Sequence, residues 1–125
     1  MGKNFRDLDV WHLGVELAET VYRVTARFPK TELFALTSQM RKAAVSIPSN
    51  IAEGRARESS KEFLYFLSIS RGSLAELDTQ LELAIRLDYV DSELHAARAQ
   101  SEILGKKLNR LQTTIRSQLQ TANGQ

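Results

Sequence analysis

The sequence predicts an all-α protein, an antiparallel up-down-up-down four-helix bundle in a single domain spanning residues 1–125. Two observations predict this fold class. Apolar residues recur at spacings of three and four along most of the chain, which is typical of amphipathic helices, and no stretch shows the alternation of a strand. Proline and glycine are scarce, at two and six residues, and several of them separate the periodic stretches.

Short breaks divide the chain into four helices, which we expect over residues 6–28, 31–53, 60–88 and 92–120. Pro29 interrupts the pattern after the first helix, and Gly54 is placed to end the second in the left-handed conformation. Ser59 and Glu62 have the spacing of a capping box at the start of the third, and Asp91 is the expected N-cap of the fourth. Because the connections are short, consecutive helices should be antiparallel.

The first helix carries more apolar surface than one helix of a monomeric bundle needs. Its apolar arc covers about 220°, against roughly 100–140° for such a helix. We assign one stripe to the core, formed by Leu8, Trp11, Val15, Ala18 and Tyr22. A second stripe, with a weaker outer stripe on the third helix, is assigned to a subunit interface formed by Val10, Leu13, Leu17, Val21, Val24, Phe28, Tyr65, Ile69, Leu83 and Leu87. The alternative is a helix that is simply well buried or covered by the chain termini.

The arrangement of these stripes favours a ring. The first and third helices of such a bundle are diagonal, so their outer stripes face opposite sides. Two different patches make a heterologous contact, which closes into a ring or continues as a filament. The core series of the second helix is expected to begin at Leu33, and the fourth helix has a single narrow stripe. We therefore expect a ring-forming homo-oligomer.

Composition disfavours catalysis. The chain has no cysteine, which excludes disulfides, thiolate catalysis and cysteine-based zinc sites. His12 and His95 are the only histidines, neither has a recognisable catalytic or metal-binding partner, and no phosphate-loop, dinucleotide or hydrolase motif occurs. We expect no enzyme activity, no metal and no cofactor. Because apolar runs are short and the first residues include no signal-like segment, we expect a cytoplasmic protein that does not enter membranes.

The second predicted helix contains a proline in its interior. Pro48 has no backbone donor and is expected to kink the helix. Ser46, Ser49 and Asn50 flank it and can supply replacement hydrogen bonds. The segment is therefore predicted to curve the second helix around its neighbours.

A series of motifs runs through the first three predicted helices: Phe5-Arg6-Asp7-Leu8 with Val10-Trp11, Phe28-Pro29 with Glu32, the run AAVSIPSNIAEG at residues 43–54, Glu62-Phe63 with Phe66-Leu67, Gly72-Ser73 with Glu76-Leu77, and Thr79-Gln80-Leu81. On these motifs the chain resembles the four-helix-bundle proteins named after reading frames inside intervening sequences of bacterial 23S ribosomal RNA genes. It departs from the family pattern at Ala35 and Asp88, where glycine is expected.

The resemblance carries expectations of its own. It implies an up-and-down bundle that assembles as a homopentameric ring. The chain is also similar to the accessory proteins of diversity-generating retroelements, which partner with a reverse transcriptase and nucleic acid. A reverse transcriptase or another protein is therefore an expected class of partner.

Charge is unevenly distributed, although the net charge is only +2. In the antiparallel bundle, the N-terminus, the turn between the second and third helices and the end of the fourth helix share one pole. This basic pole gathers Lys3, Arg6, Arg55, Arg57, Lys61, Arg110 and Arg116. Repeated around a ring, it would offer a sequence-independent surface to the phosphates of RNA or DNA. Acidic residues lie nearby, so a scaffold that binds another protein without nucleic acid is the alternative.

Overall fold

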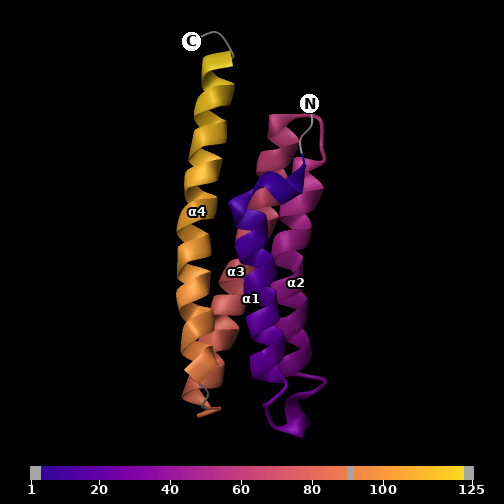
Figure 1. Ribbon diagram of the computed structural model, residues 1–125, viewed down its shortest axis with the longest axis vertical. Helices are drawn as coiled ribbons and strands as arrows, with labels where there is room; N and C mark the ends of the chain where they lie inside the picture. The colour runs from indigo at the N-terminus through magenta and orange to yellow at the C-terminus, as the bar shows by residue number, and fades with distance from the viewer. Residues whose placement is uncertain (1–3, 90–91, 123–125) are drawn as a thin grey trace.

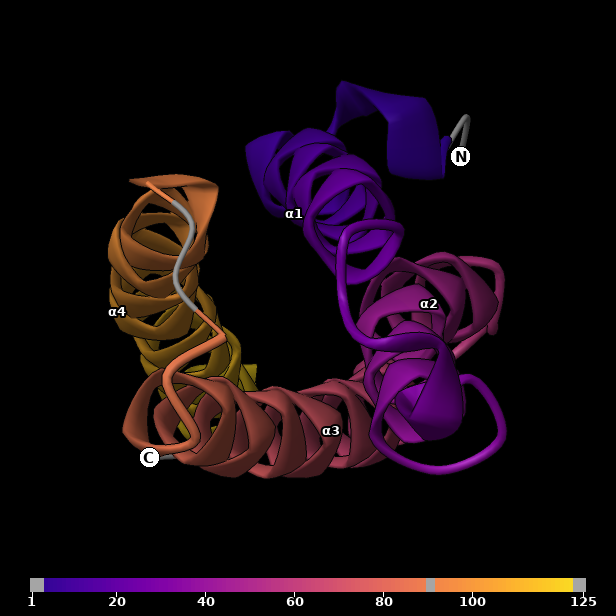
Figure 2. The ribbon, with the colours of Figure 1, turned by 90° about the horizontal axis from the view of Figure 1, so that it is seen from below.

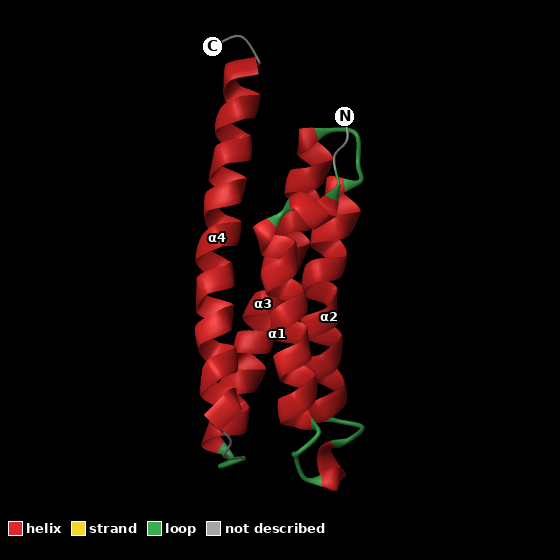
Figure 3. Cartoon of the chain, viewed as in Figure 1, coloured by secondary structure: helices red, strands yellow, loops and turns green. Residues whose placement is uncertain are grey.

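A computed structural model describes residues 4–89 and 92–122, and within these ranges it contains helices and loops but no strand (Figures 1 and 3). The elements follow in the order η1 (Phe5–Asp7), α1 (Asp9–Thr25), η2 (Lys30–Glu32), α2 (Leu36–Arg55), α3 (Ser60–Arg86) and α4 (Ser92–Ala122), the two η elements being single 3-10 turns. The predicted all-α fold class is confirmed. Lys3 and Asp91 lie outside the described residues.

The four α-helices run side by side. Figure 1 shows the chain descending in α1, returning in α2, descending in α3 and returning in α4. α1 and α3 each pack against α2 and α4, and the end-on view of Figure 2 places α1 and α3 on opposite sides of the bundle. The start of α1, the α2–α3 turn and the C-terminal half of α4 lie at the same end, where α4 extends beyond the others. The basic pole is at this end.

The two ends of α3 are closed by local hydrogen bonds. At the start, the Ser59 hydroxyl oxygen accepts the Glu62 backbone N–H at 3.1 Å, as the capping-box spacing predicts. At the end, Asp88 has a φ of +67°, and the Tyr89 N–H donates to the Ala84 carbonyl at 3.1 Å. These bonds form a Schellman motif whose left-handed position usually carries glycine. The resemblance leads us to expect glycine at this same position.

The boundaries of α1 and α2 differ from the predicted ones. Leu8 is extended, so α1 begins at Asp9 and ends at Thr25 instead of covering residues 6–28. η2 follows Pro29, and α2 begins only at Leu36, where the Glu32 carboxylate accepts the Leu36 N–H at 3.4 Å. Residues 33–35 therefore form a turn between η2 and α2, and the start of α2 is capped by a side chain outside the helix.

The core runs between the four helices, and α1 contributes to it with the stripe that we assigned to a subunit interface. The buried residues of this stripe are Val10, Leu17, Val21, Val24 and Phe28, while Leu13 is half-buried. That assignment is wrong for α1, because these side chains pack inside one subunit. The stripe predicted to face the core lies at its margin instead, and its member Tyr22 is 45% exposed. Periodicity gives the angle between two stripes, but not which one the neighbouring helices cover.

Gly54 does not end α2 in a left-handed turn. It lies inside the helix and is buried, and a Cβ placed on it would come 2.7 Å from the Cβ of Phe66 and 3.0 Å from Cδ1 of Phe63. Glycine is therefore required at this position by the close approach of α3, and the helix continues to Arg55.

α2 runs through Pro48 as one helix. The buried proline ring fits against Gly14 of α1, where a Cβ would come 3.2 Å from Cβ of Pro48. Asn50 Nδ2 donates to the Ser46 carbonyl at 2.8 Å and to the Ser46 hydroxyl oxygen at 2.9 Å. Ser49 is exposed. The segment thus contributes a packing contact to α1 and a local hydrogen-bond network, and the kink itself stays a prediction.

Candidate functional site

The structure brings part of the predicted basic pole together and engages several of its side chains. Arg57 forms an ion pair with Glu53 at 2.6 Å, and its guanidinium lies over the Phe66 ring at 4.8 Å from the centroid. Arg6 lies over the Phe5 ring at 4.8 Å. Exposed pairs of this kind are weak, so both guanidinium groups can still meet a phosphate at modest cost.

The C-terminal half of α4 adds a cationic surface that sequence reasoning only partly found. Residues 103–122 contain no Asp or Glu, but include Lys106, Lys107, Arg110 and Arg116. Lys107 reaches Asp9 at 3.1 Å and Lys106 reaches Glu102 at 3.6 Å. Arg110 and Arg116 are exposed on the C-terminal half of α4, so they continue the basic pole along this helix.

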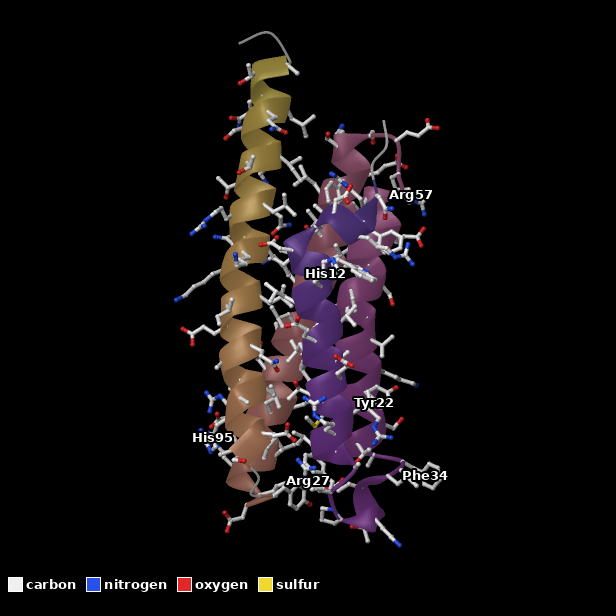
Figure 4. All side chains as sticks on the ribbon, viewed as in Figure 1. His12, Tyr22, Arg27, Phe34, Arg57 and His95 are labelled. Atoms are coloured by element: carbon white, nitrogen blue, oxygen red, sulfur yellow. The ribbon has the colours of Figure 1, made fainter. Side chains whose placement is uncertain are left out.

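A groove of about 620 Å³ lies on the outer side of α1 and α2, near the end opposite the basic pole. We call it the Phe34 groove. Its apolar lining consists of Tyr22, Leu33, Phe34 and Val45. Phe34 is 91% exposed, and Figure 4 shows it pointing away from the bundle. The Arg41 guanidinium lies over the Tyr22 ring at 4.6 Å, and its Nε donates to the Thr25 hydroxyl at 2.9 Å.

Sequence reasoning missed this groove because it placed Tyr22 and Leu33 in the core. The two consecutive large apolar residues Leu33 and Phe34, between Pro29 and the next helix, are the signal that was available. A helix starting at residue 31 was expected to turn Leu33 toward the core, but the turn that replaces it leaves Leu33 47% exposed and presents Phe34 to solvent.

The outer stripe predicted on α3 is present at the surface. Tyr65 is 63% exposed, Leu83 is 47% exposed and Leu87 is 45% exposed, while Ile69 is half-buried. We call these four residues the α3 stripe. It belongs to a different element from the Phe34 groove, so the subunit carries two separate exposed apolar surfaces.

The titratable groups with altered pKa values take part in structural contacts. Hydrogen bonds from Arg27 and Arg23 lower the pKa of Glu93, and the bond from Arg86 lowers that of Glu82. The hydrogen bond that Tyr89 donates to Glu32, 2.7 Å long, raises the pKa of the Tyr89 hydroxyl. Each of these contacts joins neighbouring segments or turns of the bundle.

Neither histidine lies in a metal-binding cluster. Nε2 of His12 is 2.8 Å from the Arg6 carbonyl oxygen, and His95 is exposed. In the ranges that the structure describes, no three His, Cys, Asp or Glu side chains are grouped to hold a metal ion. No helix within these same ranges is long and apolar enough to cross a membrane.

The chain is similar in sequence to one known protein family and in fold to a solved structure. The profile of the family described as "23S rRNA-intervening sequence protein" matches residues 6–110. A crystal structure of a protein of unknown function from the S23 ribosomal protein family of Bacteroides thetaiotaomicron superposes with a TM-score of 0.76. It is 24% identical, and the match covers 83% of this chain and 95% of that one, so it supports the fold. None of the curated proteins matches this chain. Because the family profile covers most of its length, the chain belongs to the 23S rRNA-intervening sequence protein family.

Proposed function

We propose that this protein is a non-enzymatic bundle that assembles with copies of itself into a ring. The observation that carries the proposal is the exposure of Phe34, at 91%, on the edge of an apolar groove. An exposed phenylalanine beside further apolar surface is typical of a protein contact. The ring has five subunits in this proposal, as the family resemblance implies.

The occupant of the Phe34 groove in this proposal is the α3 stripe of a second copy. The groove and the stripe are different surfaces, so a contact between them is heterologous and leads to a closed ring or a filament. Their charges are complementary, because Lys42 is exposed in the lining of the groove and Glu76 is exposed on α3 between Ile69 and Leu83. This pairing replaces the interface that we first assigned to α1.

Native mass spectrometry at micromolar concentration tests the assembly. For the wild type we expect a mass of about 70 kDa, five times the 14.1 kDa of the chain. Phe34→Ser should yield the subunit mass while retaining the helical circular dichroism, because Phe34 supports no core contact. Ile103→Ser is the matched control, since Ile103 is 51% exposed and belongs to neither surface. A monomeric wild type would refute the proposal.

A charge exchange identifies the partner surface. Lys42→Glu and Glu76→Lys should each weaken the assembly, and the double variant should recover it, because the opposite charges are restored across the interface. If the double variant is weaker than both single variants, the groove does not bind the α3 stripe.

We propose a second function, which is binding of the phosphate backbone of RNA or DNA by the basic pole. The absence of acidic residues from 103 to 122, beside four cations, favours this function. No Phe, Tyr or Trp occurs after Tyr89, so base stacking is not offered along α4 and the contacts are ionic.

The salt dependence of binding tests this second function. Arg110→Ala combined with Arg116→Ala should reduce the slope of log K against log salt by about 2, equally for unrelated sequences. Arg86→Ala with Arg98→Ala removes the same charge at the opposite end and should leave the slope unchanged. If the wild type binds neither RNA nor DNA at low salt, the protein-binding scaffold is the remaining function.

A further inference from the structure

A pocket of about 230 Å³ opens where the end of α2, the start of α3 and the C-terminal half of α4 meet. The polar residues that line it are Arg55, Arg57, Glu58, Ser59, Ser60, Thr114 and Gln118. Phe63, Leu111 and Ile115 add apolar surface. Three helices therefore enclose a site at the basic pole that differs from the exposed face of α4.

Arg55 lines this pocket, and its side chain has one donor that lacks a hydrogen-bond partner. Its Nε is buried and has no hydrogen-bond partner, and its guanidinium lies over the Phe63 ring at 5.7 Å. A buried N–H without an acceptor is destabilising, so native proteins nearly always provide a partner. The neighbouring Arg57 differs, since it is paired with Glu53 at 2.6 Å.

We infer that this pocket binds a phosphate group, with the Arg55 guanidinium shifting toward the pocket so that its Nε–H, which is covered in the free protein, donates to a phosphate oxygen. The guanidinium is suited to this ligand because its donors form a rigid planar fork that matches phosphate geometry. Thr114 and Gln118 bring further donors from α4, and α3 begins in the pocket wall, where the positive end of its dipole favours an anion. Phe63 holds the guanidinium from one side.

The inference deepens the second proposed function and rests on it for the source of the phosphate. A phosphate group reaches the protein either within a nucleic-acid backbone or as a free phosphate or phosphate monoester. Both sources present non-bridging phosphate oxygens that can accept from Arg55. The experiment uses inorganic phosphate as the first probe, so the pocket is tested independently of the nucleic-acid surface on α4.

Thermal unfolding with sodium phosphate, at ionic strength matched by sodium chloride, provides the first measurement. A concentration one hundred times Kd should raise the Tm of the wild type by about 10 °C. Arg55→Gln and Arg55→Lys should each lower phosphate affinity by about 10- to 100-fold, since both remove the Nε–H donor. Arg86→Gln should bind like the wild type, because it makes the same charge change at the opposite end of the bundle, outside the pocket.

The ¹⁵N–¹H signal of the Arg55 Nε provides a readout that does not depend on stability. It is identified by its loss in Arg55→Lys and should move downfield as phosphate is added. A wild-type protein whose Tm and Nε signal ignore phosphate overturns the inference, as does an equal Tm rise in Arg55→Gln. An equal effect of sodium acetate also overturns it, because the site would then take any carboxylate.

Competition identifies the source. Displacement of phosphate by an oligonucleotide with hydroxyl ends supports a backbone phosphodiester, and displacement by a nucleoside monophosphate alone supports a monoester. If phosphate fails to bind while the α4 variants still lower the salt slope, the pocket is wrong and the nucleic-acid function stands. If phosphate binds and nucleic acid does not, the second proposed function fails and the pocket stands.

Discussion

Replacing Gly54 by alanine should destabilise the bundle, because α2 and α3 approach too closely there for a side chain. The added Cβ would lie 2.7 Å from Cβ of Phe66, an atom fixed to the α3 backbone that no side-chain rotation can move away. Overpacking of this kind costs about 1–3 kcal/mol. Alanine recovers about 1 kcal/mol of helix propensity. Because this contact is very close, we expect an overpacking cost in the upper part of that range, about 2–3 kcal/mol. The gain in helix propensity reduces the net loss of stability to about 1–2 kcal/mol.

Gly72→Ala is the matched control. Gly72 is exposed inside α3, and a Cβ there would meet nothing within 4 Å. This variant should gain about 0.5–1 kcal/mol from helix propensity alone. Urea unfolding measures both variants, with the midpoint of Gly54→Ala falling by about 1 M for an m-value near 1.5 kcal/mol/M. Each variant is measured at two protein concentrations, since assembly stabilises the folded chain. A Gly54→Ala protein as stable as Gly72→Ala would refute the close-approach argument.

The remaining predictions concern the core, a turn and an ion pair. Leu17→Glu should unfold the subunit, seen as loss of the helical circular dichroism, because Leu17 is fully buried, whereas Leu83→Glu at the surface should retain the fold. Asp88→Gly should raise the free energy of unfolding by about 0.5–1 kcal/mol, because glycine adopts the observed φ of +67° without strain, and an unchanged or lower urea midpoint would contradict this. Glu93 has a pKa lowered from 4.5 by its hydrogen bonds, first from Arg27, so its contribution to stability is present above about pH 4.5 and is lost as pH falls through the lowered pKa. The Tm of Glu93→Gln should therefore decrease less than the wild-type Tm as the pH falls below 4.5. The same decrease in Tm for both proteins would contradict this linkage between the Glu93 pKa and stability.

The elements that sequence patterns located well are those closed by local contacts. Ser59 and Glu62 lie three residues apart, and their interaction forms within one helical turn, so the start of α3 at Ser60 follows from the sequence. The single apolar stripe predicted on α4, from Leu94 to Leu119, faces the other helices, since one stripe has only one possible inner face. Most of its residues are buried, while Leu111 and Leu119 are half-buried. α2 was placed less well, because its start depends on the Glu32 side chain outside the helix.

The candidate sites depend on contacts that sequence patterns do not contain. Phe34 was not predicted to be exposed, because the apolar spacing is compatible with a helix that begins at residue 31, whereas α2 begins only at Leu36. The pocket at Arg55 exists because α4 comes alongside the α2–α3 turn, which places residues about sixty apart in sequence in one lining. The basic pole could be predicted, since antiparallel order alone brings its cations to one end.

The sequence alone determined the helical class, the number of helices and the existence of two apolar stripes on α1, because these follow from spacing within one segment. Only the tertiary structure decided which stripe is buried. On the helical wheel of α1, the two apolar stripes lie on either side of the direction opposite the polar residues. The spacing of apolar residues therefore favours neither stripe as the buried one. Gly14 packs closely against Pro48 of α2, and Leu17 and Val21, which share this face of α1, are buried while Tyr22 is at the surface. The rotation of a helix about its own axis depends on how it packs against its neighbours, so the sequence of that helix alone does not determine it.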